Sequence, residues 1–77
     1  MASSWVGITG TRVGAVTEFD DARGIGTVLG DDGAVVAFHC TQIAGGRRTI
    51  HVGARVRYEL APGALGEWEA TGLDEVT

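Results

Sequence analysis

The sequence predicts an all-β fold, a small antiparallel barrel of five strands. The chain has 77 residues, and 13 of them are glycine. Apolar and polar residues alternate over several short runs, which is the pattern of strands with one buried face. Turn-forming residues separate these runs at intervals of about ten residues, as in sandwiches and barrels. Because closing the sheet removes exposed edges in a chain this short, we expect a Greek-key barrel.

The first half of the chain is expected to form three strands. Residues 13–19 predict the first strand, residues 20–24 a turn, and residues 25–29 the second strand. The sequence Asp31-Asp32-Gly33 predicts a hairpin, because glycine readily adopts the positive φ of a tight turn. In the third strand, residues 34–39, alternation points Val36 and Phe38 inward and Ala37 and His39 outward.

The second half is expected to add two strands. Residues 41–43 predict a short helical turn, residues 44–48 a loop, and residues 54–61 the clearest strand of the chain. Residues 62–66 predict a loop, residues 68–73 the last strand, and residues 74–77 an acidic tail. We expect residues 1–11 to form an N-terminal arm and residues 12–77 the domain. The expected core is Val16, Val28, Val36, Phe38, Ile43, Val56, Tyr58 and Leu60.

Charge and cysteine content limit the classes of function. The formal net charge is −4, and all six basic residues are arginines, so the chain lacks the basic surplus typical of nucleic-acid-binding proteins. The single cysteine, Cys40, excludes an intramolecular disulfide and favours a reducing compartment. Residues 1–10 lack the features of a signal peptide, and no apolar stretch is long enough to span a membrane. We therefore expect a cytoplasmic protein without membrane contact.

Residues that carry chemistry do not occur in the patterns that catalysis or metal binding requires. His39 and Cys40 are neighbours, so in a strand their side chains point to opposite sides unless the strand ends between them. No paired ligand spacing such as Cys-x-x-Cys accompanies them. The acids at positions 20–21 and 31–32 are explained by turn chemistry. We expect neither an enzyme nor a cofactor or metal site.

Three segments resemble the cold-shock domain. The first is Gly14-x-Val16-x-x-Phe19-Asp20-x-x-Arg23-Gly24-x-Gly26-x-Val28-x-x-Asp31-Asp32-Gly33. The second is Val36-x-Phe38-His39-x-Thr41-x-Ile43, and the third is Arg48-Thr49-Ile50-x-Val52-Gly53-x-Arg55-Val56-x-Tyr58. Together they match in order and spacing over residues 13–73, nearly the whole chain. The resemblance implies a five-stranded OB-type barrel that binds single-stranded RNA or DNA.

The expected binding face departs from the pattern of that family. Two short motifs of the family present aromatic rings on which bases stack, at about 1–3 kcal/mol per base. Here Ile25 and Thr27 stand where the first motif has phenylalanines, and Ala37 and Cys40 replace aromatic residues of the second. Glu18 takes the place of a tryptophan and puts an anion beside the expected phosphate path. The resemblance is therefore closer in the scaffold than in the binding site.

The candidate nucleic-acid-binding residues combine what remains of that site with nearby arginines. Of the family's stacking set, only Phe19 and His39 match, and His39 is either a residual base contact or an ordinary exposed histidine. Arg47 and Arg48, with the arginines of residues 54–61, form either a basic patch or a solvated surface in which Glu59 is a partner. The candidate residues are Phe19, Arg23, Ile25, Thr27, Ala37, His39, Arg47 and Arg48.

Two functions remain open from the sequence. The first is weak binding of single-stranded nucleic acid, and the family resemblance favours it as our expectation. The second is a protein-interaction or regulatory module that keeps the barrel but has lost the nucleic acid, which the net charge and the missing aromatic residues favour. Its mildly apolar patch would consist of Ile25, Thr27, Val35 and Ala37, with Trp5 and Trp68 as candidate anchors.

Overall fold

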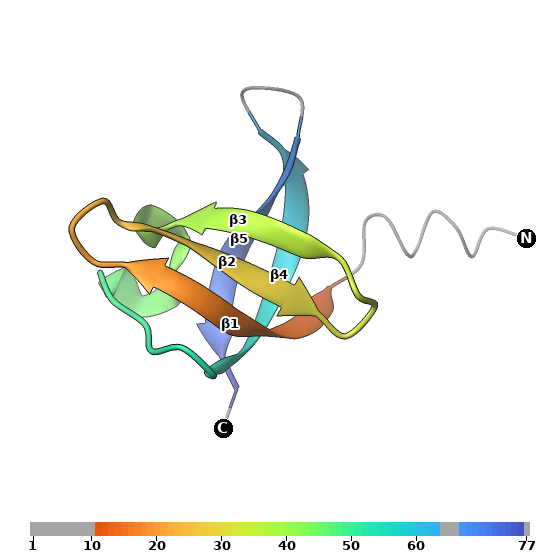
Figure 1. The fold of residues 1–77 in the computed structure, drawn as a ribbon, viewed down its shortest axis with the longest axis horizontal. Helices are drawn as coiled ribbons and strands as arrows, with labels where there is room; N and C mark the ends of the chain where they lie inside the picture. Colours follow the sequence, from red (N-terminus) through yellow and green to blue (C-terminus); the bar gives the residue numbers. More distant parts are fainter. Residues whose placement is uncertain (1–10, 64–66, 77) are drawn as a thin grey trace, which may run out of the picture.

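A computed structural model describes residues 11–63 and 67–76, and in it five strands close into a barrel (Figure 1). Residues 1–10 of the expected arm, with Trp5, lie outside the described residues. Within the described residues, no helix is long and apolar enough to cross a membrane. The elements are β1 (Arg12–Asp20), β2 (Ile25–Gly30), β3 (Val35–His39), the 3-10 turns η1 (Cys40–Gln42) and η2 (Ala44–Gly46), β4 (Arg55–Pro62) and β5 (Trp68–Glu75).

The barrel order is β1-β2-β3-β5-β4, and β4 pairs back with β1. The predicted all-β barrel is confirmed, but one of its strand pairs, β3 with β5, is parallel. A closed ring of five strands requires this, because directions cannot alternate around an odd number of strands. This parallel pair has the shortest ladder of the barrel, because within residues 11–63 and 67–76 it has one paired position, Ala37 opposite Glu69.

The last strand is longer than the sequence predicted. Residues 74 and 75, expected in an acidic tail, belong to β5, where Asp74 lies opposite Arg57 and Glu75 opposite Val56. The Arg57 guanidinium lies 3.3 Å from the Asp74 carboxylate. Opposite charges facing each other across two strands favour pairing at this end of the ladder.

The core occupies the inside of the barrel and contains seven of the eight predicted residues. Leu60 differs, because it is only partly buried and packs against the edge of the core near the end of β4. Alternation along the strands correctly separates inward from outward residues in β3 and in most of β4. The core also includes Ile50, Ala54, Ala70 and Leu73, which the sequence analysis did not assign to it.

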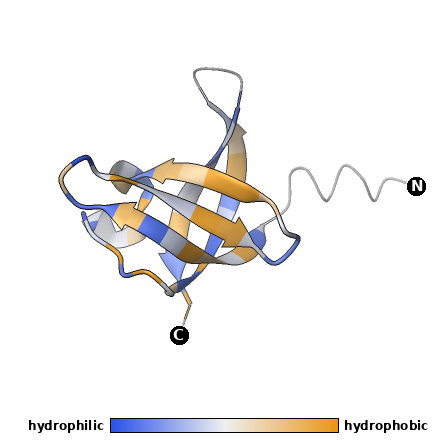
Figure 2. Cartoon of the chain, viewed as in Figure 1, coloured by the Kyte–Doolittle hydropathy of each residue, from blue (hydrophilic) through white to orange (hydrophobic). Residues whose placement is uncertain are grey.

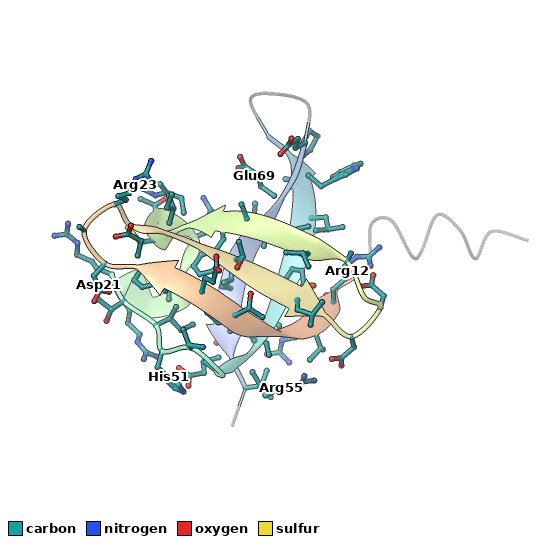
Figure 3. All side chains as sticks on the ribbon, in the orientation of Figure 1. Arg12, Asp21, Arg23, His51, Arg55 and Glu69 are labelled. Atoms are coloured by element: carbon teal, nitrogen blue, oxygen red, sulfur yellow. The ribbon has the colours of Figure 1, made fainter. Side chains whose placement is uncertain are left out.

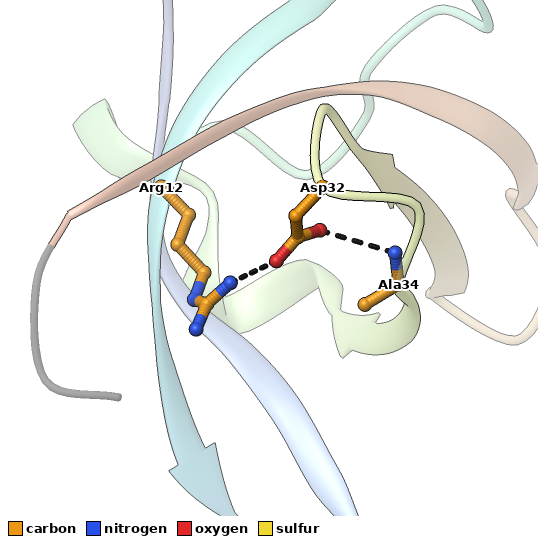
Figure 4. Close-up of polar contacts among 3 residues, drawn as sticks. All are labelled: Arg12, Asp32 and Ala34. Atoms are coloured by element: carbon orange, nitrogen blue, oxygen red, sulfur yellow. Dashed lines mark hydrogen bonds and ion pairs between the residues drawn. The ribbon is translucent and has the colours of Figure 1, made fainter. Parts of the chain in front are cut away.

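Two arginines from other strands hold the β2–β3 hairpin. Arg12 of β1 pairs with Asp32, whose other carboxylate oxygen accepts a hydrogen bond of 3.1 Å from the Ala34 backbone N–H (Figure 4). Arg55 of β4 donates two hydrogen bonds, 3.0 and 2.9 Å long, to Asp31. Gly33 adopts the predicted positive φ, 90°. Both aspartates therefore link the turn to neighbouring strands, and Asp32 also shapes it through its bond to Ala34.

The bond from Arg55 holds the pKa of Asp31 below its ordinary value. A carboxyl group with a lowered folded pKa stabilises the fold above its unfolded pKa of about 3.9, and that contribution is lost as pH falls through the folded pKa. We expect Arg55→Met to raise the pKa of Asp31 toward the ordinary value, as measured by an NMR titration of the side-chain carboxyl. Arg57→Met is the matched control, because Arg57 pairs with Asp74 instead. If the pKa of Asp31 stays below its ordinary value in Arg55→Met, the bond from Arg55 is not what lowers it.

Candidate functional site

A groove of about 650 Å³ lies on the outer face of β1, β2 and β3, where β1 ends and β2 begins. Six of the eight candidate residues line it: Phe19, Arg23, Ile25, Thr27, Ala37 and His39. Arg23 stands at the β1–β2 turn, and Glu69 lies near the start of β5 on the same side of the barrel (Figure 3). The structure therefore brings together residues from four strands, β1, β2, β3 and β5, and from the β1–β2 turn.

A β-bulge in β1 shapes one wall of the groove. The pairing of β1 with β2 shifts register between Val16 and Glu18, so that Thr17 and Glu18 are both exposed. The residue after them, Phe19, is half-buried and stacks on the core ring of Phe38, with centroids 5.9 Å apart and planes 9° apart. A bulge re-aims the side chains that follow it. Phe19 is therefore a ring that is held in place by the core and lines the groove.

The floor of the groove comes from two pairs of facing residues in β2 and β3. Ile25 lies opposite His39, and Thr27 lies opposite Ala37. Ile25 is 39% exposed, and the Thr27 hydroxyl is 2.7 Å from the hydroxyl of Thr17. As expected from the hairpin, Ile25, Thr27 and Ala37 lie side by side on the outer face. Their small or aliphatic side chains leave a hollow where larger rings would form a platform.

Gly26 allows the close approach beneath this floor. A Cβ atom at this position would lie 2.5 Å from the Glu18 carbonyl oxygen and 2.7 Å from the Phe38 ring. Such distances are below ordinary contact, so any side chain would push β1 or Phe38 away. The glycine thus serves the tight packing of the barrel strand, as glycines in strands often do.

His39 combines a position in the groove with a local structural role. Its Nδ1 caps η1 by accepting a hydrogen bond of 3.2 Å from the Thr41 backbone N–H, and it also lies 3.0 Å from the Thr41 hydroxyl. Because a backbone N–H only donates, the neutral ring carries its proton on Nε2. The strand ends between His39 and Cys40, and the Cys40 thiol is partly buried against the core.

Three carboxylates line the groove against one guanidinium. The acids are Glu18, Asp20 and Glu69, and the base is Arg23. One oxygen of Asp20 accepts hydrogen bonds from the backbone N–H groups of Ala22 and Arg23, at 3.0 and 3.2 Å, which matches the predicted turn role. Among the described residues that line the groove, these carboxylates outnumber the guanidinium, so the groove has an excess of negative charge. This excess opposes the binding of polyanions.

Arg47 and Arg48 do not line the groove. Three of the four arginines proposed for a basic patch have acidic partners instead: Arg47 with Glu75 at 3.1 Å, Arg55 with Asp31 at 2.9 Å, and Arg57 with Asp74 at 3.3 Å. The sequence analysis named Glu59 as a partner, but these partners come from the β2–β3 turn and from β5. Exposed pairs of this kind neutralise charge and contribute little stability.

Five residues that line the groove were not among the candidate binding residues: Glu18, Asp20, Gly26, Phe38 and Glu69. Glu69 reaches it because β5 closes the barrel beside β3, and no local pattern reveals that closure. Phe38 was predicted as core, and it is 2% exposed, yet its ring also lines the groove behind Phe19. Its stacking with Phe19 was not predictable from alternation, because the bulge in β1 is what brings the two rings together.

This chain resembles known proteins in its fold but not in its amino-acid sequence. No protein-family model and no curated protein sequence matches the chain. Among solved structures, a Drosophila structure described as Unr CSD456 matches with a TM-score of 0.75 and 16% sequence identity. The match covers 99% of this chain and 31% of that one, so this chain spans about a third of its length. The chain therefore has the five-stranded barrel fold of the cold-shock domain.

Proposed function

We propose that the groove binds single-stranded nucleic acid weakly. One observation supports this above the others: the ring of Phe19, the guanidinium of Arg23 and the imidazole of His39 all line the same groove. A half-buried aromatic ring offers a face on which a base stacks. A guanidinium binds phosphate oxygens, and the imidazole adds a flat ring with a polar edge. Proteins commonly use these kinds of contact to bind unpaired nucleotides.

The same geometry limits the affinity. Ile25, Thr27 and Ala37 occupy the floor where rings would add about 1–3 kcal/mol of stacking per base. The carboxylates of Glu18 and Glu69 would face a strand of phosphates and lose favourable hydration beside it. Arg23 alone provides a cation among the described residues of the groove. Binding therefore depends on one or two stacked bases and very few phosphate contacts.

Titration with a fluorescent oligothymidylate at two salt concentrations tests this function. We expect a dissociation constant in the micromolar range or weaker. The logarithm of affinity should fall with the logarithm of salt concentration by about 0.7 per neutralised phosphate, so the total slope should be shallow. Phe19→Leu, which keeps an apolar contact to Phe38, should weaken binding by about fivefold or more through the lost stacking.

Trp68→Ala is the matched control for this titration. Trp68 is an aromatic residue that is 50% exposed and does not line the groove, so its removal should leave the affinity unchanged. A nanomolar complex at physiological salt would contradict the weak site. Absence of binding even at low salt would exclude the nucleic-acid function for this groove.

A second candidate is a protein-interaction module, and the charge of the groove favours it. A face with exposed apolar residues and surplus carboxylates is complementary to a protein with the opposite charge. Neither function involves catalysis, so we propose a binding protein rather than an enzyme. We also propose that it acts in a reducing compartment such as the cytoplasm, where its one cysteine remains a thiol.

A further inference from the structure

The sheet face that carries the groove continues into an apolar surface at the other end of β2 and β3. Leu29 lies opposite Val35, and these side chains are 42% and 63% exposed. Ala15 of β1 lies opposite Leu29 on its other side. We name these three residues the apolar platform. Apolar colouring extends along β3 and over the end of β2 in Figure 2. Leu29 and Val35 are neighbouring exposed apolar side chains, and the half-buried Ala15 borders them, so they form a contiguous apolar surface of the kind that can mark a contact site.

The apolar platform and the groove form one continuous strip. Side chains two residues apart on a strand share a face, so Leu29 of β2 is in line with Thr27 and Ile25, while Val35 of β3 is in line with Ala37. Four residues of a strand cover about 13 Å. The strip is therefore long enough for an extended segment of four or five residues.

Unpaired carboxylates flank this strip. Glu18 and Glu69 line it from β1 and β5, and neither forms an ion pair with any residue in 11–63 or 67–76. Arg23 is one cation against the three carboxylates of the groove, while Arg55 is paired with Asp31 and Arg12 with Asp32 at the hairpin. The surface thus presents apolar side chains between two exposed negative charges.

We infer that this strip binds a protein segment that is both apolar and basic. Apolar side chains of the segment lie on the apolar platform, and its arginine or lysine side chains reach Glu18 and Glu69. This inference rests on the second candidate function, not on nucleic-acid binding. A second copy of this chain fits poorly, because it would set the same carboxylates against each other in a protein of net charge −4. A nucleic-acid strand would bring phosphates to those carboxylates.

Two synthetic octapeptides test the inference by fluorescence anisotropy, one alternating leucine with arginine and the other leucine with glutamate. We expect the Leu/Arg peptide to bind and the Leu/Glu peptide not to bind. The double variant Glu18→Gln/Glu69→Gln should weaken the binding of the Leu/Arg peptide by about fivefold, since each exposed pair contributes modestly. Leu29→Ser should weaken it as well, and amide NMR shifts should appear at Leu29, Val35 and Ala37.

Val52→Ser is the matched control, because Val52 is 60% exposed and does not line the groove. It should leave peptide binding unchanged, and the NMR spectra report whether each variant folds. Failure of the Leu/Arg peptide to bind, or equal binding of the Leu/Glu peptide, would overturn the inference. The inference would also be overturned if the protein associates with itself and Leu29→Ser abolishes that association, because the strip would then bind a second copy of the chain. If oligothymidylate changes the amide NMR shifts of Leu29 and Val35 and displaces the peptide, the strip binds nucleic acid instead.

Discussion

Phe38→Ala is expected to lower the free energy of unfolding by about 3–5 kcal/mol, the usual cost of removing a buried aromatic ring. Phe38 is 2% exposed and stacks on Phe19 at a centroid distance of 5.9 Å. The substitution removes ring contacts from the core and leaves a cavity directly behind the groove. Because small domains are stable by only about 5–15 kcal/mol, the variant should be close to unfolding at ambient temperature. Urea denaturation followed by circular dichroism measures the change.

Val35→Ala is the matched control for that substitution. Val35 is on the same strand as Phe38 but is 63% exposed, so its truncation should change stability by no more than about 0.5 kcal/mol. If Phe38→Ala melts within a few degrees of the unmodified protein, the ring is not part of a tightly packed core. The control also separates a general sensitivity of β3 to substitution from the specific loss of the buried ring.

The features that the sequence predicted are those with a local cause. Alternation placed Val36 and Phe38 inside and Ala37 and His39 outside, because the two faces of one strand differ in burial. The Asp-Asp-Gly turn fixed the β2–β3 hairpin, and that hairpin in turn put Thr27 beside Ala37. Each of these follows from residues close together in the chain.

The features that the sequence did not predict depend on distant parts of the chain. Glu69 enters the groove only because an odd number of strands must close with a parallel pair. The bulge at Thr17 adds one residue to β1, and so it turns Phe19 toward Phe38. The partners of Arg47 and Arg57 come from β5, whose end was expected to be a tail. The negative charge of the groove, which separates the two candidate functions, was therefore only partly foreseeable.

Rebuilding the aromatic floor should raise the affinity for single-stranded nucleic acid by tenfold or more. The change combines Ile25→Phe, Thr27→Phe and Ala37→Phe with Glu18→Trp, all at residues that line the groove. Each ring should add about 1–3 kcal/mol of base stacking, and about 1.4 kcal/mol corresponds to a tenfold change in affinity. The tryptophan also removes one carboxylate from the path of the phosphates. Titration with pyrimidine-rich oligonucleotides measures the gain.

The barrel should tolerate these changes because their side chains lie on its outer face, although the bond between the hydroxyls of Thr17 and Thr27 is lost. The matched control adds three phenylalanines elsewhere, at Val13, Val52 and Val76, which are exposed and do not line the groove. It adds a similar amount of apolar surface but no stacking rings in the groove, so its affinity for the oligonucleotides should equal that of the unmodified protein. If the rebuilt groove folds but binds no better, missing rings do not limit binding. The remaining carboxylates of Asp20 and Glu69 would then be the dominant barrier, and the strip would be better matched to a basic protein segment.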